Sequence, residues 1–273
     1  MNTPWLAHYD ATVPHTIGTY PEKTLVDFVA ERARKKPDST ALLFKGRRIS
    51  YGEIERASDA FARGLRGIGV KEGERVALVL PNAPQFIIAE LAIWKLGAII
   101  APQNPIYTER ELQESLGATT PETAIVLTPF YERVKRIQPN TSLKRVIATN
   151  IKEYLPGVLR VLFTLVKEKK EGHRIELRDG DHWFQSLMKE GAPVQAAAAP
   201  DQGAVVLMSG GTTGTPKGVL SDHRSLVMAG TQIEAVLRES LQGRTLRSCC
   251  RCRSSTRTDA RARRRSRSSA ACR

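Results

Sequence analysis

The stretch of the chain with the clearest chemistry, residues 209–218, has the sequence Ser-Gly-Gly-Thr-Thr-Gly-Thr-Pro-Lys-Gly. It follows the apolar run 204–208 and leads into Val219 and Leu220. Glycines let successive backbone N–H groups turn toward one side, where they form a concave site for an anion. The threonine hydroxyls add donors, and Lys217 adds a compact positive charge. The composition of this loop therefore predicts that it binds a polyphosphate.

Two common phosphate-binding patterns do not fit the loop. The Walker A pattern requires glycine before the lysine and serine or threonine after it, whereas Pro216 and Gly218 flank Lys217 here. The dinucleotide pattern G-x-G-x-x-G is excluded because the stretch contains no G-x-G. From the residue types alone, a flexible connection without a ligand stays open as the simpler alternative.

The loop resembles the phosphate loop of the adenylate-forming (AMP-binding) superfamily, whose signature is approximately [ST]-[SG]-G-[ST]-T-G-x-P-K-G. It agrees with that signature at every position, through Ser209, Gly210, Gly211, Thr212, Thr213, Gly214, Thr215, Pro216, Lys217 and Gly218. Other stretches resemble the family in order and spacing, namely 24–28, 49–54, 79–82, 95–98, 104–108 and 221–226. These further matches are core and turn positions. They imply the fold and add no catalytic residue.

The resemblance implies an ATP-dependent activation of a carboxylate. The carboxylate attacks the α-phosphorus of Mg²⁺-bound ATP, pyrophosphate leaves, and coenzyme A then expels AMP from the acyl-adenylate. The loop would hold the β- and γ-phosphates. The family's aromatic-Gly-x-Thr-Glu segment, ribose-binding aspartate, hinge and catalytic lysine have no counterpart in this sequence. We therefore expect no catalytic residue in this chain, and a truncated, inactive fragment of such an enzyme.

A second stretch bears on the subfamily. Residues 154–166 are strongly apolar apart from Arg160, and the charged residues 167–171 follow. This run is too short to span a bilayer, which requires roughly 18 apolar residues or more. A similar insertion is typical of long-chain fatty acyl-CoA synthetases, which implies a fatty acid as the substrate. Peripheral membrane contact through 154–170 and ordinary packing in the core both stay open.

The elements that must position the loop alternate between strands and helices. Periodicity predicts helices over 24–36, 51–65, 84–96, 109–116, 129–137 and 224–238. It predicts a hairpin of 41–44 with 48–51, and strands over 75–80, 98–101, 123–127, 145–148, 204–208 and 217–221. Short apolar strands alternating with helices indicate an α/β fold with mostly parallel sheets between helices. With the resemblance, we expect the incomplete N-terminal domain of the adenylate-forming fold.

The formal charge of +14 is unevenly distributed along the 273 residues. Residues 244–273 contain eleven arginines and one acid, and so carry +10, which leaves +4 for residues 1–243. All four cysteines also lie in 244–273. We therefore expect a domain over 1–243 and a disordered basic tail over 244–273. Because the change falls inside a domain, a frame shift is the favoured origin. A tail that binds RNA, and a cysteine metal site with poor spacing, are the alternatives.

The remaining features place the protein in a broad class. Residues 1–5 show no secretory signal, and no apolar run is long enough for a membrane span. We expect a cytoplasmic enzyme, peripheral to the inner face of the membrane if 154–170 contacts lipid. The five histidines have no metal-ligand spacing, and we expect His223 to have a structural role or to support a residue that contacts the ligand. No specific nucleic acid is expected. The alternative function is a non-catalytic fragment that binds a nucleotide, or binds RNA through the tail.

Overall fold

The computed structural model describes residues 3–9, 13–209 and 217–237. The chain divides into two compact units, Met1–Gln242 and Gly243–Arg273. The second unit lies wholly outside the described residues, so the predictions for the basic tail are not addressed by the structure.

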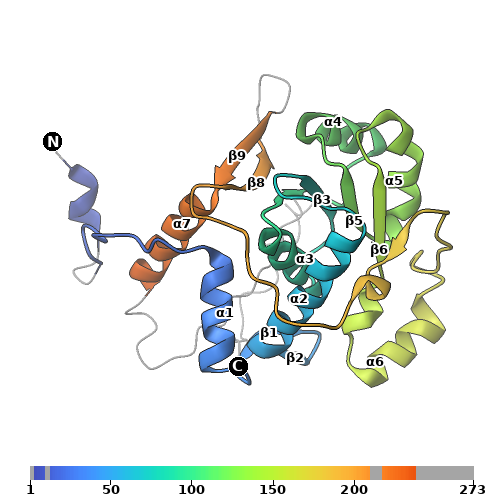
Figure 1. Ribbon diagram of the computed structural model, residues 1–273, viewed down its shortest axis with the longest axis horizontal. Coiled ribbons are helices and arrows are strands. Elements are labelled where there is room, and N and C mark those ends of the chain that lie inside the picture. Colours follow the sequence, from blue (N-terminus) through green and yellow to red (C-terminus); the bar gives the residue numbers. More distant parts are fainter. Residues whose placement is uncertain (1–2, 10–12, 210–216, 238–273) are drawn as a thin grey trace, which may run out of the picture. The chain divides into compact units, whose positions relative to one another are not determined.

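A seven-stranded sheet forms the centre of the first unit, in the order β7-β6-β5-β3-β4-β8-β9 (Figure 1). Its strands are β3 (Arg75–Val79), β4 (Ile99–Pro102), β5 (Thr123–Leu127), β6 (Arg145–Thr149), β7 (His182–Trp183), β8 (Gly203–Met208) and β9 (Gly218–Asp222). Every neighbouring pair is parallel except β8 and β9, which are antiparallel. The predicted α/β class with a mostly parallel sheet is therefore confirmed.

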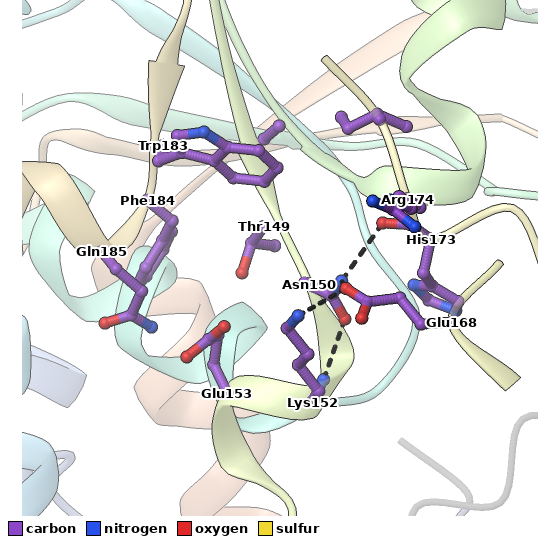
Figure 2. Close-up of a pocket in the computed structure, with 12 residues that line it drawn as sticks. Thr149, Asn150, Lys152, Glu153, Glu168, His173, Arg174, Trp183, Phe184 and Gln185 are labelled. Carbon is purple, nitrogen blue, oxygen red and sulfur yellow. Dashed lines mark hydrogen bonds and ion pairs between the residues drawn. The ribbon is translucent and has the colours of Figure 1, made fainter. Parts of the chain in front are cut away.

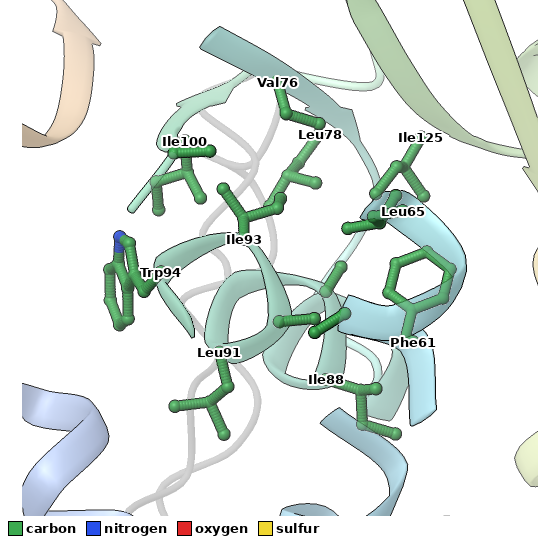
Figure 3. Close-up of a cluster of buried hydrophobic side chains, with 14 of the residues drawn as sticks. Phe61, Leu65, Val76, Leu78, Ile88, Leu91, Ile93, Trp94, Ile100 and Ile125 are labelled. Carbon is green, nitrogen blue, oxygen red and sulfur yellow. The ribbon is translucent and has the colours of Figure 1, made fainter. Parts of the chain in front are cut away.

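The two faces of the sheet carry separate cores, because side chains alternate along each strand. Val76 and Leu78 of β3 pack with residues of α2 (Tyr51–Gly67) and α3 (Pro84–Lys95), as Figure 3 shows. Ala77 and Val79 pack instead with α4 (Glu109–Thr119) and α5 (Tyr131–Ile137). Burial on both faces explains why these strands are continuous apolar runs in the sequence.

Local chemistry in the sequence determines where the helices begin. α1 (Leu25–Lys35), α2 and α4 each begin after a capping box, with Thr24, Ser50 and Thr108 as the N-caps. In each box the cap hydroxyl accepts from the third backbone N–H of the helix, and an acidic side chain at that position accepts from the cap N–H. α3 begins instead at Pro84, whose fixed φ suits the first helical turn.

A separate, two-stranded antiparallel sheet precedes α2 in the chain. β1 (Thr40–Phe44) pairs with β2 (Arg47–Ser50), as predicted. The connecting Lys45 and Gly46 both have positive φ, at 50° and 88°. Two consecutive positive φ angles are what a two-residue hairpin turn requires.

Three regions of the structure show features that the sequence analysis did not predict. The helix expected over 129–137 begins as a 3₁₀ turn, Thr128–Phe130, and becomes α-helical only from Tyr131. The apolar stretch at 154–166 is not one regular helix. It forms α6 (Gly157–Leu162) and then η5, a π-helical turn over Phe163–Lys167. The short strand β7 has too little sequence to show a period, and the prediction missed it.

A long return segment, residues 184–202, leads from β7 at one edge of the sheet toward β8, on the other side of β4. Backbone N–H groups of this segment donate hydrogen bonds to the helices α2 and α3. Val194 N–H donates to Asp59 Oδ1 at 3.2 Å, and Ala197 N–H donates to the Lys95 carbonyl at 3.0 Å. These contacts fix the segment that leads into β8, the strand that precedes the predicted phosphate loop.

Candidate phosphate-binding site

The predicted phosphate loop connects the two antiparallel strands β8 and β9, which pair from Gly203 with Asp222 to Met208 with Gly218. Ser209 N–H donates to the Lys217 carbonyl at 2.9 Å, and Lys217 N–H donates to Ser209 Oγ at 3.1 Å. The loop is therefore closed at its base by two hydrogen bonds. The predicted site residues between these ends lie outside the described residues: Gly210, Gly211, Thr212, Thr213, Gly214, Thr215 and Pro216.

The topology around the loop separates it from two other classes of phosphate site. In Walker A and dinucleotide-binding proteins, the glycine-rich loop leads from a strand into a helix. Here it leads from a strand into an antiparallel strand, and α7 (His223–Leu237) begins only after β9. The strand–loop–strand arrangement agrees with the sequence argument that excluded both patterns.

The two described ends of the loop, Ser209 and Lys217, lie at the edge of the sheet where ligands usually bind. β8 is parallel to β4, with Ile100 opposite Val205, so the carboxyl ends of both strands meet at one edge. In open α/β sheets, ligands bind outside the carboxyl ends of the strands. The segment that follows β4 is fixed there by Arg133 of α5, whose guanidinium donates to the carbonyls of Pro105 and Tyr107 at 3.1 and 2.6 Å.

Two predicted site residues at the end of the loop are described. Lys217 is exposed, and no ion pair or side-chain hydrogen bond is formed by its ammonium group within the described part of the chain. Gly218 begins β9 in a crowded place, since a Cβ there would lie 2.9 Å from Val206 Cγ1 and 3.5 Å from the Ala118 carbonyl oxygen. A free ammonium beside a tightly packed strand end suits a phosphate contact.

His223 lies just beyond β9, at the start of α7, and its Nδ1 atom has no hydrogen-bond partner among the described residues. The residue is buried, its ring packs edge-on against Trp94 at 5.3 Å, and burial lowers its pKa. Trp94 in turn donates to the Ala204 carbonyl at 2.9 Å. The histidine therefore attaches the start of α7 to α3 and β8, which supports the structural role expected for it.

A separate cavity of about 320 Å³ opens at the carboxyl end of β6 (Figure 2). Asn150, Lys152, Glu168 and His173 line one side, and the rings of Trp183 and Phe184 line the other. The Thr149 hydroxyl is buried here and has no partner among the described residues. Sequence reasoning missed this cavity, because its lining comes from separate stretches between 148 and 185 that share no motif.

The charges of this cavity are largely compensated within the protein. Glu168 accepts hydrogen bonds from Lys152 Nζ and Asn150 Nδ2, and Glu153 pairs with Arg160 at 3.0 Å. Burial lowers the pKa of His173. No cluster of three or more His, Cys, Asp or Glu side chains suited to a metal ion occurs in the residues that the structure describes.

Most of the apolar stretch 154–166 is exposed and does not pack in the core. Tyr154 and Phe163 are buried, but six large apolar side chains between 158 and 166 face solvent. Across the described ranges, no helix is long and apolar enough to cross a membrane. Of the two alternatives left open by the sequence, packing in the core therefore does not describe this segment.

Comparison with known proteins identifies the family. Residues 29–250 match the model of the family described as AMP-binding enzyme. The chain belongs to this family. This AMP-binding protein is 31% identical to a long-chain-fatty-acid–CoA ligase of Bacillus subtilis, over 84% of the chain and 41% of that enzyme. It is 30% identical to a protein of the same name from Escherichia coli O157:H7, over 86% of the chain and 43% of the relative.

Solved structures agree with this assignment at the level of the fold. A long-chain-fatty-acid-CoA ligase of Archaeoglobus fulgidus matches with a TM-score of 0.65 at 23% identity, over 83% of this chain and 42% of that one. An acetoacetyl-CoA synthetase of Streptomyces lividans matches with a TM-score of 0.65 at 22% identity, over 77% of this chain and 32% of the synthetase. The AMP-binding protein thus spans about two fifths of the length of the two bacterial relatives.

Proposed function

We propose that this chain supplies the ATP-phosphate loop of a long-chain fatty acid–CoA ligase. The observation that carries the proposal is the β8–β9 hairpin, whose connection is closed by Ser209 and Lys217 at the carboxyl edge of the sheet. Family membership supports an adenylate-forming ligase, and the names of the two bacterial relatives support a long-chain fatty acid as the substrate.

In the proposed reaction the loop acts on the leaving group. Backbone N–H groups of the loop glycines, the hydroxyls of Ser209 and the threonines, and the Lys217 ammonium would contact the β- and γ-phosphates. These donors would neutralise the charge that grows on pyrophosphate as the fatty acid carboxylate attacks the α-phosphorus. Mg²⁺ would arrive with ATP, bound by phosphate oxygens, and coenzyme A would accept the acyl group afterward.

The chain by itself is proposed not to complete this reaction, because its sequence lacks counterparts of the family segments that bind ribose and supply the catalytic lysine. Its place would be the cytoplasm, where ATP and coenzyme A are available. A nucleotide- or RNA-binding fragment that acts through the eleven arginines of 244–273 is the alternative. Salt-sensitive RNA binding that disappears when 244–273 is removed would favour it.

Two measurements of ATP–pyrophosphate exchange test the proposal. With a panel of fatty acids, we expect no fatty-acid-dependent exchange by the purified chain, and exchange would contradict its incompleteness. A chimera that places residues 1–243 of this chain before the remainder of the Bacillus subtilis relative should exchange with long-chain acids. It should lose most of that activity on Lys217→Ala. A folded chimera that is inactive with every acid would contradict the proposed function.

A further inference from the structure

The cavity of about 320 Å³ at the carboxyl end of β6, which we call the β6 cavity, has the size of a small-molecule site. Its position in the sheet separates it from the predicted phosphate loop. β6 and β7 occupy one end of the strand order, and β8 and β9 occupy the other. A ligand of the β6 cavity is therefore not the phosphate group that the loop is expected to hold.

The inner end of the β6 cavity presents a hydroxyl group that the fold leaves unpaired. Thr149 is 1% exposed, and its Oγ1 atom has no hydrogen-bond partner among the described residues. Figure 2 shows Thr149 between the rings of Trp183 and Phe184 and the polar side of the cavity, where Asn150 lies. A buried polar group without a partner costs free energy. The hydroxyl is therefore suited to bond with a group that enters the cavity.

One wall of the β6 cavity consists of two aromatic side chains. Phe184 is fully buried and stacks on Phe61 of α2, with the ring centres 3.8 Å apart, so its position is fixed by the core. Trp183 of β7 also lines the cavity, yet it is 37% exposed. Aromatic rings attract one another in offset and edge-on contacts. An indole that is open toward a cavity therefore suits a planar ring as its partner.

The charges around the β6 cavity leave one cation uncompensated. Lys152 is paired with Glu168, and Glu153 is paired with Arg160. Arg174 lines the cavity as well, but it is exposed and forms no ion pair within the described part of the chain. A guanidinium binds a carboxylate through two parallel hydrogen bonds. A single free arginine therefore suits a ligand that carries one negative charge, and does not suit a polyphosphate.

We propose that the β6 cavity binds a small heteroaromatic carboxylic acid. The ring of the acid stacks on Trp183, and its ring nitrogen accepts a hydrogen bond from the Thr149 hydroxyl at the inner end. Its carboxylate pairs with Arg174 at the exposed end. This inference goes beyond the proposed function and does not depend on it, because no residue of 209–218 takes part.

Three matched probes test this assignment on the full chain. Pyridine-4-carboxylate has the ring, the acceptor nitrogen and the charge, whereas benzoate lacks the nitrogen and pyridine-4-carboxamide lacks the charge. In isothermal titration calorimetry at about 0.15 M salt, we expect saturable binding of pyridine-4-carboxylate. The Kd of each of the other two probes should be about tenfold higher. Absence of saturable binding would show that the cavity holds only water and would overturn the proposal. Equal Kd values for the three probes would overturn it as well.

Two substitutions connect the probes to the β6 cavity and separate it from the basic residues 244–273, which are present in every variant. Thr149→Val removes the hydroxyl and nearly keeps the shape of the side chain. It should raise the Kd of pyridine-4-carboxylate about tenfold and leave the Kd of benzoate unchanged. Arg174→Gln should raise the Kd of the acid about tenfold and leave the Kd of the amide unchanged. The control Lys189→Gln should change none of these values.

Thermal unfolding distinguishes a ligand contact from a structural role of the hydroxyl. Because Thr149 Oγ1 has no partner among the described residues, Thr149→Val should keep or raise the Tm of the wild-type chain. A lower Tm would show that the hydroxyl is already used by the fold, which would contradict the proposal. The same Kd for pyridine-4-carboxylate in Thr149→Val and Lys189→Gln would also contradict it.

Discussion

At the residue scale, Lys95 is a buried charged residue on which we expect the stability of the fold to depend. Its side chain is 1% exposed, and its ammonium lies 2.7 Å from Asp59 and 2.9 Å from Glu55 of α2. Removing one partner of a buried ion pair leaves the other charge desolvated and uncompensated. We therefore expect Lys95→Met to lower the free energy of unfolding by about 3–5 kcal/mol, measured by urea denaturation.

The control for this prediction is an exposed ion pair. Lys35 lies 2.7 Å from Glu31 on α1, and Lys35→Met should cost less than about 1 kcal/mol because solvent screens that pair. Adding Glu55→Gln and Asp59→Asn to Lys95→Met should recover part of the loss, since no buried charge then stays unpaired. Equal losses for Lys95→Met and Lys35→Met would show that the buried cluster does not have this role.

At the scale of elements, α2 depends on a close approach to the turn Gln185–Leu187 that follows β7. A Cβ on Gly64 would lie 1.9 Å from the Leu187 carbonyl oxygen, which no real structure tolerates. Gly64→Ala must therefore push the turn away from the helix, and we expect it to cost about 1–3 kcal/mol or more of stability. Thermal unfolding followed by circular dichroism would measure the loss.

The same helix supplies the matched control. A Cβ on Gly67 would meet nothing within 4 Å, and Gly67 has no positive φ that would strain another residue. We expect Gly67→Ala to leave stability within about 1 kcal/mol of wild type, or to raise it slightly. If both alanine variants melted alike, the close approach of α2 to the turn would not matter to the fold.

At the scale of the whole molecule, the sequence predicts the sheet well and its surroundings less well. β5 falls on its predicted bounds, 123–127, because a short apolar run between a proline and a threonine–proline pair has few alternatives. The position of residues 157–167 could not be assigned from sequence, since an apolar run of this length suits a core helix as well as a surface helix. Only the position of Phe163 and Glu168 in three dimensions decides which face is outside.

At the candidate site, too, some features can be predicted from the sequence and others require the structure. The motif predicts the loop, and the apolar runs predict its two strands. The bonds between Ser209 and Lys217 and the position beside β4 require the structure. The cavity at Thr149 has no local signal, because residues from β6 to β7 meet there only after folding. The division at 243/244, the frame shift and the roles of the individual loop residues stay predictions.

The central claim is that the loop between β8 and β9 binds the phosphates of ATP, and equilibrium binding tests it most directly. Titration of the full chain with Mg²⁺-bound ATP at about 0.15 M salt should show saturable binding. Lys217→Ala should raise Kd about tenfold or more, because a hydrogen bond to a charged group contributes about 1.5–3 kcal/mol. Lys189→Ala, an exposed lysine on the return segment, should leave Kd unchanged. The same Kd for both lysine variants, or no saturable binding by the wild-type chain, would contradict the claim.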